Sequence, residues 1–208
     1  MSHNAKKSFK LTKRGMLCRC HRPPPREHLH TRVIKCHGFR REDGFWEIEG
    51  RLVDTKTYGV LSHAQGDLKP EKAIHDMSIR LTVDDELEIH EAVGCMDHTP
   101  YPICGKAAFT VDGLKGLKVG PGWTRRAHKL LGGRRGCTHL FELLRPIATV
   151  CFQTMSGSRF RGDKEQTTKS KKHVKKPFFI NSCHALASDG DIVKEFWPQF
   201  YEERRSSN

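Results

Sequence analysis

AIHDMSIRLTV (residues 73–83), followed directly by DDELEIHEAV (84–93), is the stretch of sequence that decides the fold. Polar and apolar side chains alternate along the first segment, as they do in a strand with one buried face. The residues expected on the core face are His75, Met77, Ile79, Leu81 and Val83. Asp84-Asp85 favours a turn, after which 87–93 has the pattern of a second strand. We therefore predict an antiparallel hairpin over 73–93.

Upstream of this hairpin, the sequence predicts two more extended segments joined by a tight turn. The first begins near residue 29, and Asp43-Gly44 is a strong turn signal. An apolar strand follows over 45–58, with a potential break at Gly50.

Downstream, three helical segments are predicted, near 100–108, over 123–131 and over 137–154. The last has an apolar stripe at helical spacing, formed by Cys137, Phe141, Leu144, Ala148 and Cys151. Pro146 is expected to kink or split this helix, because it lacks a backbone donor. The fold class expected is therefore α+β, with an antiparallel sheet in the N-terminal half packed against helices from the C-terminal half.

The formal net charge of the 208-residue chain is +13, and it is concentrated in two segments. Residues 1–26 carry eight basic residues and no acidic one, and 159–176 carry eight basic residues against two acidic ones. All other residues together have a net charge of −1. We expect a basic, disordered arm over 1–28, a single α+β domain over 29–204, and a basic flexible insertion over 156–176.

The composition also bounds the function. A neutral body argues against specific recognition of nucleic acid, so nonspecific RNA binding by the two basic segments is the weakest alternative. No apolar run reaches membrane-spanning length, and the N-terminal segment lacks the apolar core of a signal peptide. The eight cysteines do not have the spacing of a disulfide framework. We therefore expect a cytoplasmic protein with reduced thiols and no membrane partner.

The first candidate site combines His75 and Asp76 with Asp54 and Lys56. Asp54 and Lys56 are two residues apart and should share one strand face, whereas a histidine on the core face needs a hydrogen-bond partner. A buried histidine beside a carboxylate is the usual arrangement for a general base. The alternatives are a structural histidine bonded to a backbone carbonyl and, for Asp54 and Lys56, an ordinary surface ion pair.

The second candidate site is Cys137-Thr138-His139, which directly follows Gly136. A thiol at a helix N-terminus has its pKa lowered by the helix field, which favours the thiolate as a nucleophile or metal ligand. The alternative is that Cys137, like Cys104, is a small buried hydrophobic residue.

Several motifs along the chain occur in a recognisable order. They are Asp43-Gly44-x-Trp46, Glu49-Gly50-x-Leu52-x-Asp54-x-Lys56, Ile74-His75-Asp76-Met77, Pro100 with Cys104, Gly122-Trp123, Gly136-Cys137-Thr138-His139-Leu140-x-Glu142-Leu143 and Cys183-His184. In this order the chain resembles the bacterial domain of unknown function 2889 family over about residues 32–201. The resemblance implies a link with the bacterial breakdown of aromatic compounds, and hence a small-molecule enzyme.

On this basis we expect a cofactor-independent acid/base lyase that acts on an oxygenated aromatic compound. The reaction would be an elimination or C–C cleavage that releases a small aldehyde or water. The expected catalytic residues are His75, Asp76, Asp54, Lys56, Cys137 and His139. The expected substrate contacts are Trp46, Tyr58, Met77, Trp123 and Glu142. A homo-oligomer is compatible with the sequence.

The order of the elements is also similar, more distantly, to that of the NifU-like iron–sulfur scaffold proteins. This likeness implies a NifU-like arrangement of the fold and an alternative function as a metal-binding scaffold or hydrolase module. Zinc or an iron–sulfur cluster would then be held by Asp97, Cys104 and Cys137, with His139 as a fourth ligand.

Overall fold

The computed structural model describes residues 25–162, 176–177 and 179–203. The chain divides into two compact units, Met1–Phe160 and Arg161–Asn208. The predicted arm over 1–28 and insertion over 156–176 fall largely outside the described residues.

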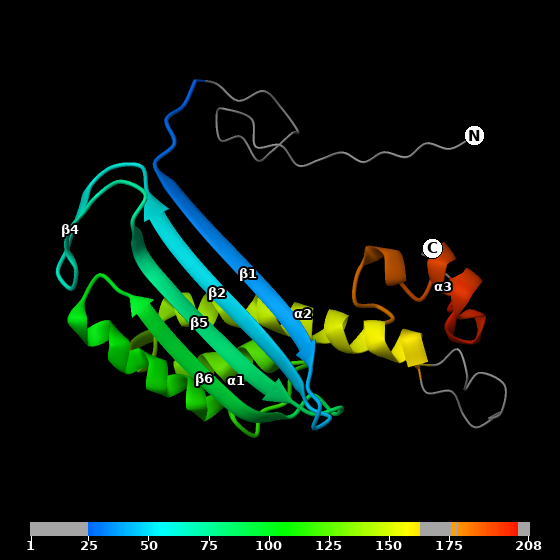
Figure 1. The fold of residues 1–208 in the computed structure, drawn as a ribbon. Coiled ribbons are helices and arrows are strands. Elements are labelled where there is room, and N and C mark those ends of the chain that lie inside the picture. Colours follow the sequence, from blue (N-terminus) through cyan, green and yellow to red (C-terminus); the bar gives the residue numbers. More distant parts are fainter. Residues whose placement is uncertain (1–24, 163–175, 178, 204–208) are drawn as a thin grey trace. The chain divides into compact units, whose positions relative to one another are not determined.

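The first unit is built on a four-stranded antiparallel sheet (Figure 1). Its strands are β1 (His30–Arg40), β2 (Trp46–Lys56), β5 (Ala73–Val83) and β6 (Ile89–His98), in the order β1-β2-β5-β6. A short hairpin of β3 (Val60–Ser62) and β4 (Gly66–Leu68) is inserted between β2 and β5. The predicted hairpin over 73–93 is confirmed as β5 and β6, and the predicted turn at Asp43-Gly44 joins β1 to β2.

The helices of the first unit follow the sheet in sequence. They are η1 (Pro102–Leu114), α1 (Trp123–Leu131), η2 (Gly133–Arg135) and α2 (Thr138–Gly162). The helix predicted over 123–131 is confirmed as α1, and the segment predicted near 100–108 forms the longer 3-10 helix η1. Helix α2 continues through Pro146 without being split, and it extends beyond the predicted end at residue 154. The α+β class is therefore confirmed.

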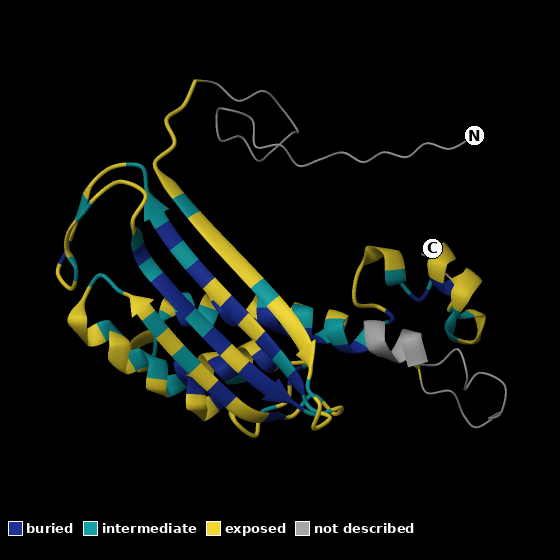
Figure 2. Cartoon of the chain, viewed as in Figure 1, coloured by how far each residue is buried: buried dark blue, intermediate teal, exposed yellow. Residues whose placement is uncertain are grey.

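The core lies between the sheet and these helices, which cover one of its faces (Figure 1). Figure 2 shows the alternation of buried and exposed residues along β2 and β5 that the sequence pattern predicts. From β5 the core receives Met77, Ile79, Leu81 and Val83. The other face of the sheet carries charged and polar side chains, as in many antiparallel sheets with one solvated face.

Helix α2 approaches the sheet closely because glycines stand opposite it. A methyl group on Gly50 of β2 would lie 2.7 Å from the Ile147 side chain, and one on Gly38 of β1 would overlap the Thr154 side chain. Strand β2 is not interrupted at Gly50. The glycine therefore provides space for the helix instead of breaking the strand.

The second unit contains η3 (His184–Leu186), α3 (Asp191–Phe196) and η4 (Pro198–Phe200). Its short elements are joined by polar contacts. The backbone N–H of Ser188 donates to Asn181 Oδ1 at 2.7 Å, and the Ser188 hydroxyl donates to Glu202 at 3.0 Å. Lys176 forms an ion pair with the same glutamate at 2.9 Å.

Within the described part of the chain, no helix is both long and apolar enough to cross a membrane.

Candidate functional site

A buried carboxylate, Asp54, lies near the end of β2 on the face that the helices cover. It follows the buried Leu52 by two residues, so the alternation of the strand directs it toward the core side. Only 1% of its side chain is exposed. A buried charge is strongly unfavourable unless it is paired and hydrogen-bonded, so its partners decide what this residue can do.

The first partner is Arg32, which lies directly opposite Asp54 on β1. Its guanidinium donates two hydrogen bonds of 2.8 Å, from Nε to Oδ1 and from Nη2 to Oδ2. The third nitrogen, Nη1, donates to Glu142 of α2. A forked pair of this kind fixes the orientation of the carboxylate as well as its charge.

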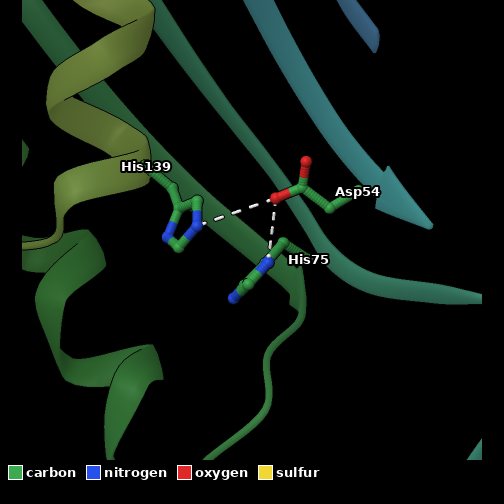
Figure 3. A group of neighbouring side chains, drawn as sticks. All are labelled: Asp54, His75 and His139. Carbon is green, nitrogen blue, oxygen red and sulfur yellow. Dashed lines mark hydrogen bonds and ion pairs between the residues drawn. The ribbon is translucent and has the colours of Figure 1, made fainter. Parts of the chain in front are cut away.

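Two histidines meet at one oxygen of this carboxylate (Figure 3). His75 lies opposite Asp54 on β5, and its Nδ1 is 3.0 Å from Oδ2. His139, in the first turn of α2, has its Nε2 3.6 Å from the same oxygen. A third histidine, His30 of β1, has its Nε2 3.3 Å from Oδ1. We call these residues the Asp54 cluster: His30, Arg32, Asp54, His75 and His139.

The rings of His75 and His139 lie against each other, with centroids 3.8 Å apart and planes inclined by 30°. Their side chains are 17% and 26% exposed, so both are accessible from solvent while the carboxylate behind them is not. The cluster therefore presents two imidazoles at a surface, supported by a buried charge.

The ionisation of the cluster follows from burial and from Arg32. Burial opposes the charge of Asp54, but the hydrogen bonds and charge of Arg32 outweigh it, so the pKa of Asp54 lies below its ordinary value. Burial lowers the pKa of His75 below 6.5, although Asp54 acts in the opposite direction. Burial, then the neighbouring His75 and Arg32, lower the pKa of His139. At neutral pH the site therefore consists of two neutral imidazoles beside a carboxylate anion.

Cys137 joins this cluster through His139. Its sulfur is 3.8 Å from His139 Nδ1 and 4.0 Å from the sulfur of Met77. Met77 itself is buried two residues along β5 from His75. The structure thus brings the two sites predicted from sequence, His75 with Asp54 and Cys137 with His139, into one site.

Asp76 and Lys56 do not share that arrangement. Asp76 follows His75 on a strand and therefore faces the opposite side of the sheet, where Arg51 donates to it at 2.7 and 2.5 Å. These hydrogen bonds lower the pKa of Asp76. The amine of Lys56 lies over the ring of Tyr58, 5.7 Å from its centroid. Lys56 stays near the cluster, however, because it stands opposite His30 in the sheet.

The five residues expected to contact substrate have different surroundings. Trp46 is buried in the core at the far end of β2, eight residues or about 26 Å from Asp54, and its indole N–H donates to Asp85 at 2.9 Å. Trp123 is likewise buried, at the start of α1. Met77 contacts Cys137, Glu142 binds Arg32, and Tyr58 is exposed beside Lys56.

Of the alternative metal ligands, Cys137 and His139 contact each other, but Asp97 lies apart from them. Asp97 accepts a hydrogen bond from Cys95 and lines a groove of about 550 Å³ on the open face of the sheet, together with Arg51 and Arg80. Cys137 lies on the helix-covered side. Among the described residues, the group of three or more potential ligands that converge is instead Asp54, His75 and His139, whose ligand atoms lie within 4.8 Å of one another.

Arg32 and His30 are the site residues that sequence reasoning missed. They lie two apart on β1, so they share one face of that strand, and they pair with Asp54 and Lys56 across the sheet. The turn at Asp43-Gly44 would have revealed this register, since a hairpin closed there places Arg32 opposite Asp54.

Comparison with known proteins places part of the chain in a protein family. Residues 30–153 match the model of a family described as protein of unknown function (DUF2889). The matched span contains the whole Asp54 cluster and Cys137. No curated protein and no solved structure matches the chain, so the likeness to NifU-like scaffold proteins gains no support.

Proposed function

We propose that this chain, which belongs to the DUF2889 family, is a small-molecule enzyme: a cofactor-independent acid/base lyase acting on an oxygenated aromatic compound. The observation that carries the proposal is the pair of accessible, neutral imidazoles on one buried carboxylate that Arg32 keeps ionised. The substrate class comes from the family resemblance. The exposed Tyr58, with the Lys56 amine over its ring, supports an aromatic substrate, because the pair offers a stacking surface and a cation to a phenolate.

His75 is the proposed base. Its Nδ1–H donates to Asp54, which leaves the lone pair of Nε2 available for a proton of the substrate. As Nε2 takes that proton, the imidazolium is stabilised by the Asp54 anion behind it. Since burial holds the pKa of His75 below 6.5, the ring is in its basic form at neutral pH.

The reaction follows from removing one proton from a hydroxyl group. The electrons of the O–H bond form a carbonyl as the adjacent C–C bond breaks, which releases a small aldehyde. The other fragment leaves as a carbanion conjugated with the aromatic ring and then takes a proton. Loss of water by elimination uses the same base at a C–H bond. The neighbouring His139 can deliver the proton that the leaving fragment requires.

The test is turnover of hydroxyalkyl-substituted phenols, with the released aldehyde measured by a colorimetric assay. We expect His75→Ala and Asp54→Asn to lower kcat by about 100-fold or more, the range for loss of general acid/base catalysis. Asp76→Asn is the matched control, because Asp76 lies next to His75 in sequence but on the other face of the sheet. Equal turnover by wild type and His75→Ala would contradict the proposal.

A metal-dependent reaction at the same three residues is the second candidate, favoured by the convergence of their ligand atoms. Two observations weigh against it. The two rings pack against each other with planes inclined by 30°, whereas imidazoles bind metals through lone pairs in the ring plane. Arg32 also places a positive charge on both oxygens of Asp54. Activity that survives dialysis against a chelator supports the lyase, and activity restored only by zinc supports the metal.

A further inference from the structure

Cys137 has surroundings that the proposed proton transfers do not use. Its sulfur lies 3.8 Å from His139 Nδ1, and the other nitrogen of that ring lies 3.6 Å from Asp54 Oδ2. Thiol, imidazole and carboxylate thus stand in a row, with the imidazole between the other two. This is the order of groups in nucleophilic catalysis by cysteine, where the base is oriented by a third group.

The start of α2 adds a second element to this arrangement. Cys137 immediately precedes the helix, and its carbonyl accepts the first helical hydrogen bond, from Phe141 N at 2.9 Å. The N–H groups of Thr138, His139 and Leu140 consequently have no acceptor within the helix. Donors of this kind next to a nucleophilic sulfur can stabilise an oxyanion that forms when the sulfur attacks a carbonyl.

We propose that Cys137 is a nucleophile, activated by His139 and Asp54, that adds reversibly to the carbonyl carbon of an aldehyde. The choice of an aldehyde rests on the proposed function, since a small aldehyde is the product expected there. The thiol proton passes to His139 Nδ1, the sulfur–carbon bond forms, and the carbonyl π bond opens onto its oxygen. That oxygen then takes the proton from His139, which completes a hemithioacetal. Nothing is oxidised or reduced, and no group leaves.

The chain contains its own comparison thiols. Cys95 and Cys183 are exposed, whereas Cys137 is partly buried. Cys95 also donates to Asp97 at 3.3 Å, and this contact, followed by burial, raises the pKa of its thiol. If exposure alone decided the rate of reaction, Cys95 and Cys183 would react faster than Cys137. The proposal predicts the reverse order.

The experiment measures alkylation of the full chain by iodoacetamide at pH 7, with the modified cysteines identified by mass spectrometry. We expect Cys137 to react at least 10-fold faster than Cys95 and Cys183. His139→Gln should slow Cys137 about 10-fold and leave Cys95 unchanged. In a second arm, acetaldehyde, as a small aldehyde, should protect Cys137 of the wild-type chain and not Cys183.

If Cys137 of the wild-type chain reacts more slowly than both exposed cysteines, the proposal is wrong. This outcome needs no variant, so it does not depend on whether a variant folds. Absence of protection by the aldehyde would overturn the assignment of its electrophile. The lyase assay gives an independent result. Fast alkylation of Cys137 without lyase turnover would contradict the proposed function and support the nucleophile. Lyase turnover with slow alkylation of Cys137 would support the proposed function and contradict the nucleophile.

Discussion

At the residue scale, the central question is how a carboxylate with 1% exposure remains ionised. Asp54 accepts two hydrogen bonds from Arg32 and one from His75, and His30 and His139 lie nearby. Breaking a buried pair by removing one partner is costly because it leaves the other charge uncompensated. The chain thus keeps a buried carboxylate, which is unfavourable for stability, within hydrogen-bonding or ion-pairing reach of two accessible histidines. Such an arrangement is typical of functional sites.

Asp54→Asn should lower the pKa of His75 further below 6.5, because the carboxylate is the group that raises it against burial. The measurement is a titration of the histidine ring protons by NMR. Asp76→Asn serves as the control, since Asp76 interacts with Arg51 and His98 on the other face. A higher pKa of His75 in Asp54→Asn would show that the carboxylate does not stabilise the protonated ring.

Much of this site could be predicted from the residues. Strand alternation predicted His75 on the core face, where the structure pairs it with Asp54, and the helix start placed Cys137 and His139 together. Alternation also implies that Asp76 faces away from His75, so grouping the two was inconsistent with the strand itself. The contact between strand and helix could not be predicted, because it depends on how α2 packs across the sheet.

At the scale of elements, the packing of α2 depends on the glycines opposite it. Gly50→Ala should lower the free energy of unfolding by about 1–3 kcal/mol, as overpacking of a core does, because the new methyl group would lie 2.7 Å from Ile147. Chemical denaturation measures the change. Gly105→Ala is the control, since nothing lies within 4 Å of the methyl group it would add.

The double variant Gly50→Ala with Ile147→Ala sharpens this test, because alanine lacks both the Cγ1 and the Cδ1 atoms that the new methyl group would meet. It should be more stable than the sum of the two single changes predicts. Strict additivity would mean that the cost of Gly50→Ala arises elsewhere than in this contact.

Helix α2 also shows why element boundaries are hard to predict. Pro146 removes one backbone hydrogen bond, but Leu143, Leu144 and Ile147 around it are almost completely buried. The packing of this apolar face compensates for the lost bond, so the helix continues where local sequence favours a break. The helix also runs on to Gly162, into the stretch from residue 156 for which a basic insertion is predicted.

At the scale of the whole molecule, the free energy of unfolding should decrease in two separate pH windows as the pH is lowered. The pKa values of His75 and His139 are lowered on folding, so the unfolded chain binds protons first and stability is lost as the pH falls below about 6.5. The pKa values of Asp54 and Asp76 are also lowered, and their contribution is lost as the pH falls below about 3.9.

Urea denaturation at a series of pH values between 7.5 and 3 tests this prediction. The variant His75→Asn/His139→Asn should lose the first decline and retain the second. Stability that stays constant between pH 7.5 and 5 in the wild-type chain would contradict the assignment of lowered histidine pKa values.

The distribution of charge bears on the RNA alternative. The whole net charge of +13 is accounted for by 1–26 and 159–176, since all other residues together have a net charge of −1, and most of these two segments lies outside the described residues. The open face of the sheet mixes both signs, with Lys35, Arg51 and Arg80 beside Glu49 and Asp97. Such a face offers no continuous basic track for a phosphate backbone. RNA binding by the two basic segments therefore stays a prediction.

The position of Arg32 and His30 has a further consequence. Both belong to β1, which borders the sheet and is bonded to one neighbouring strand only. Detachment of the first residues of β1 would remove the guanidinium of Arg32 and the ring of His30 from Asp54, while His75 and His139 stay on β5 and α2. The NMR signals of the His75 and His139 rings should therefore report whether the first residues of this edge strand are paired with β2.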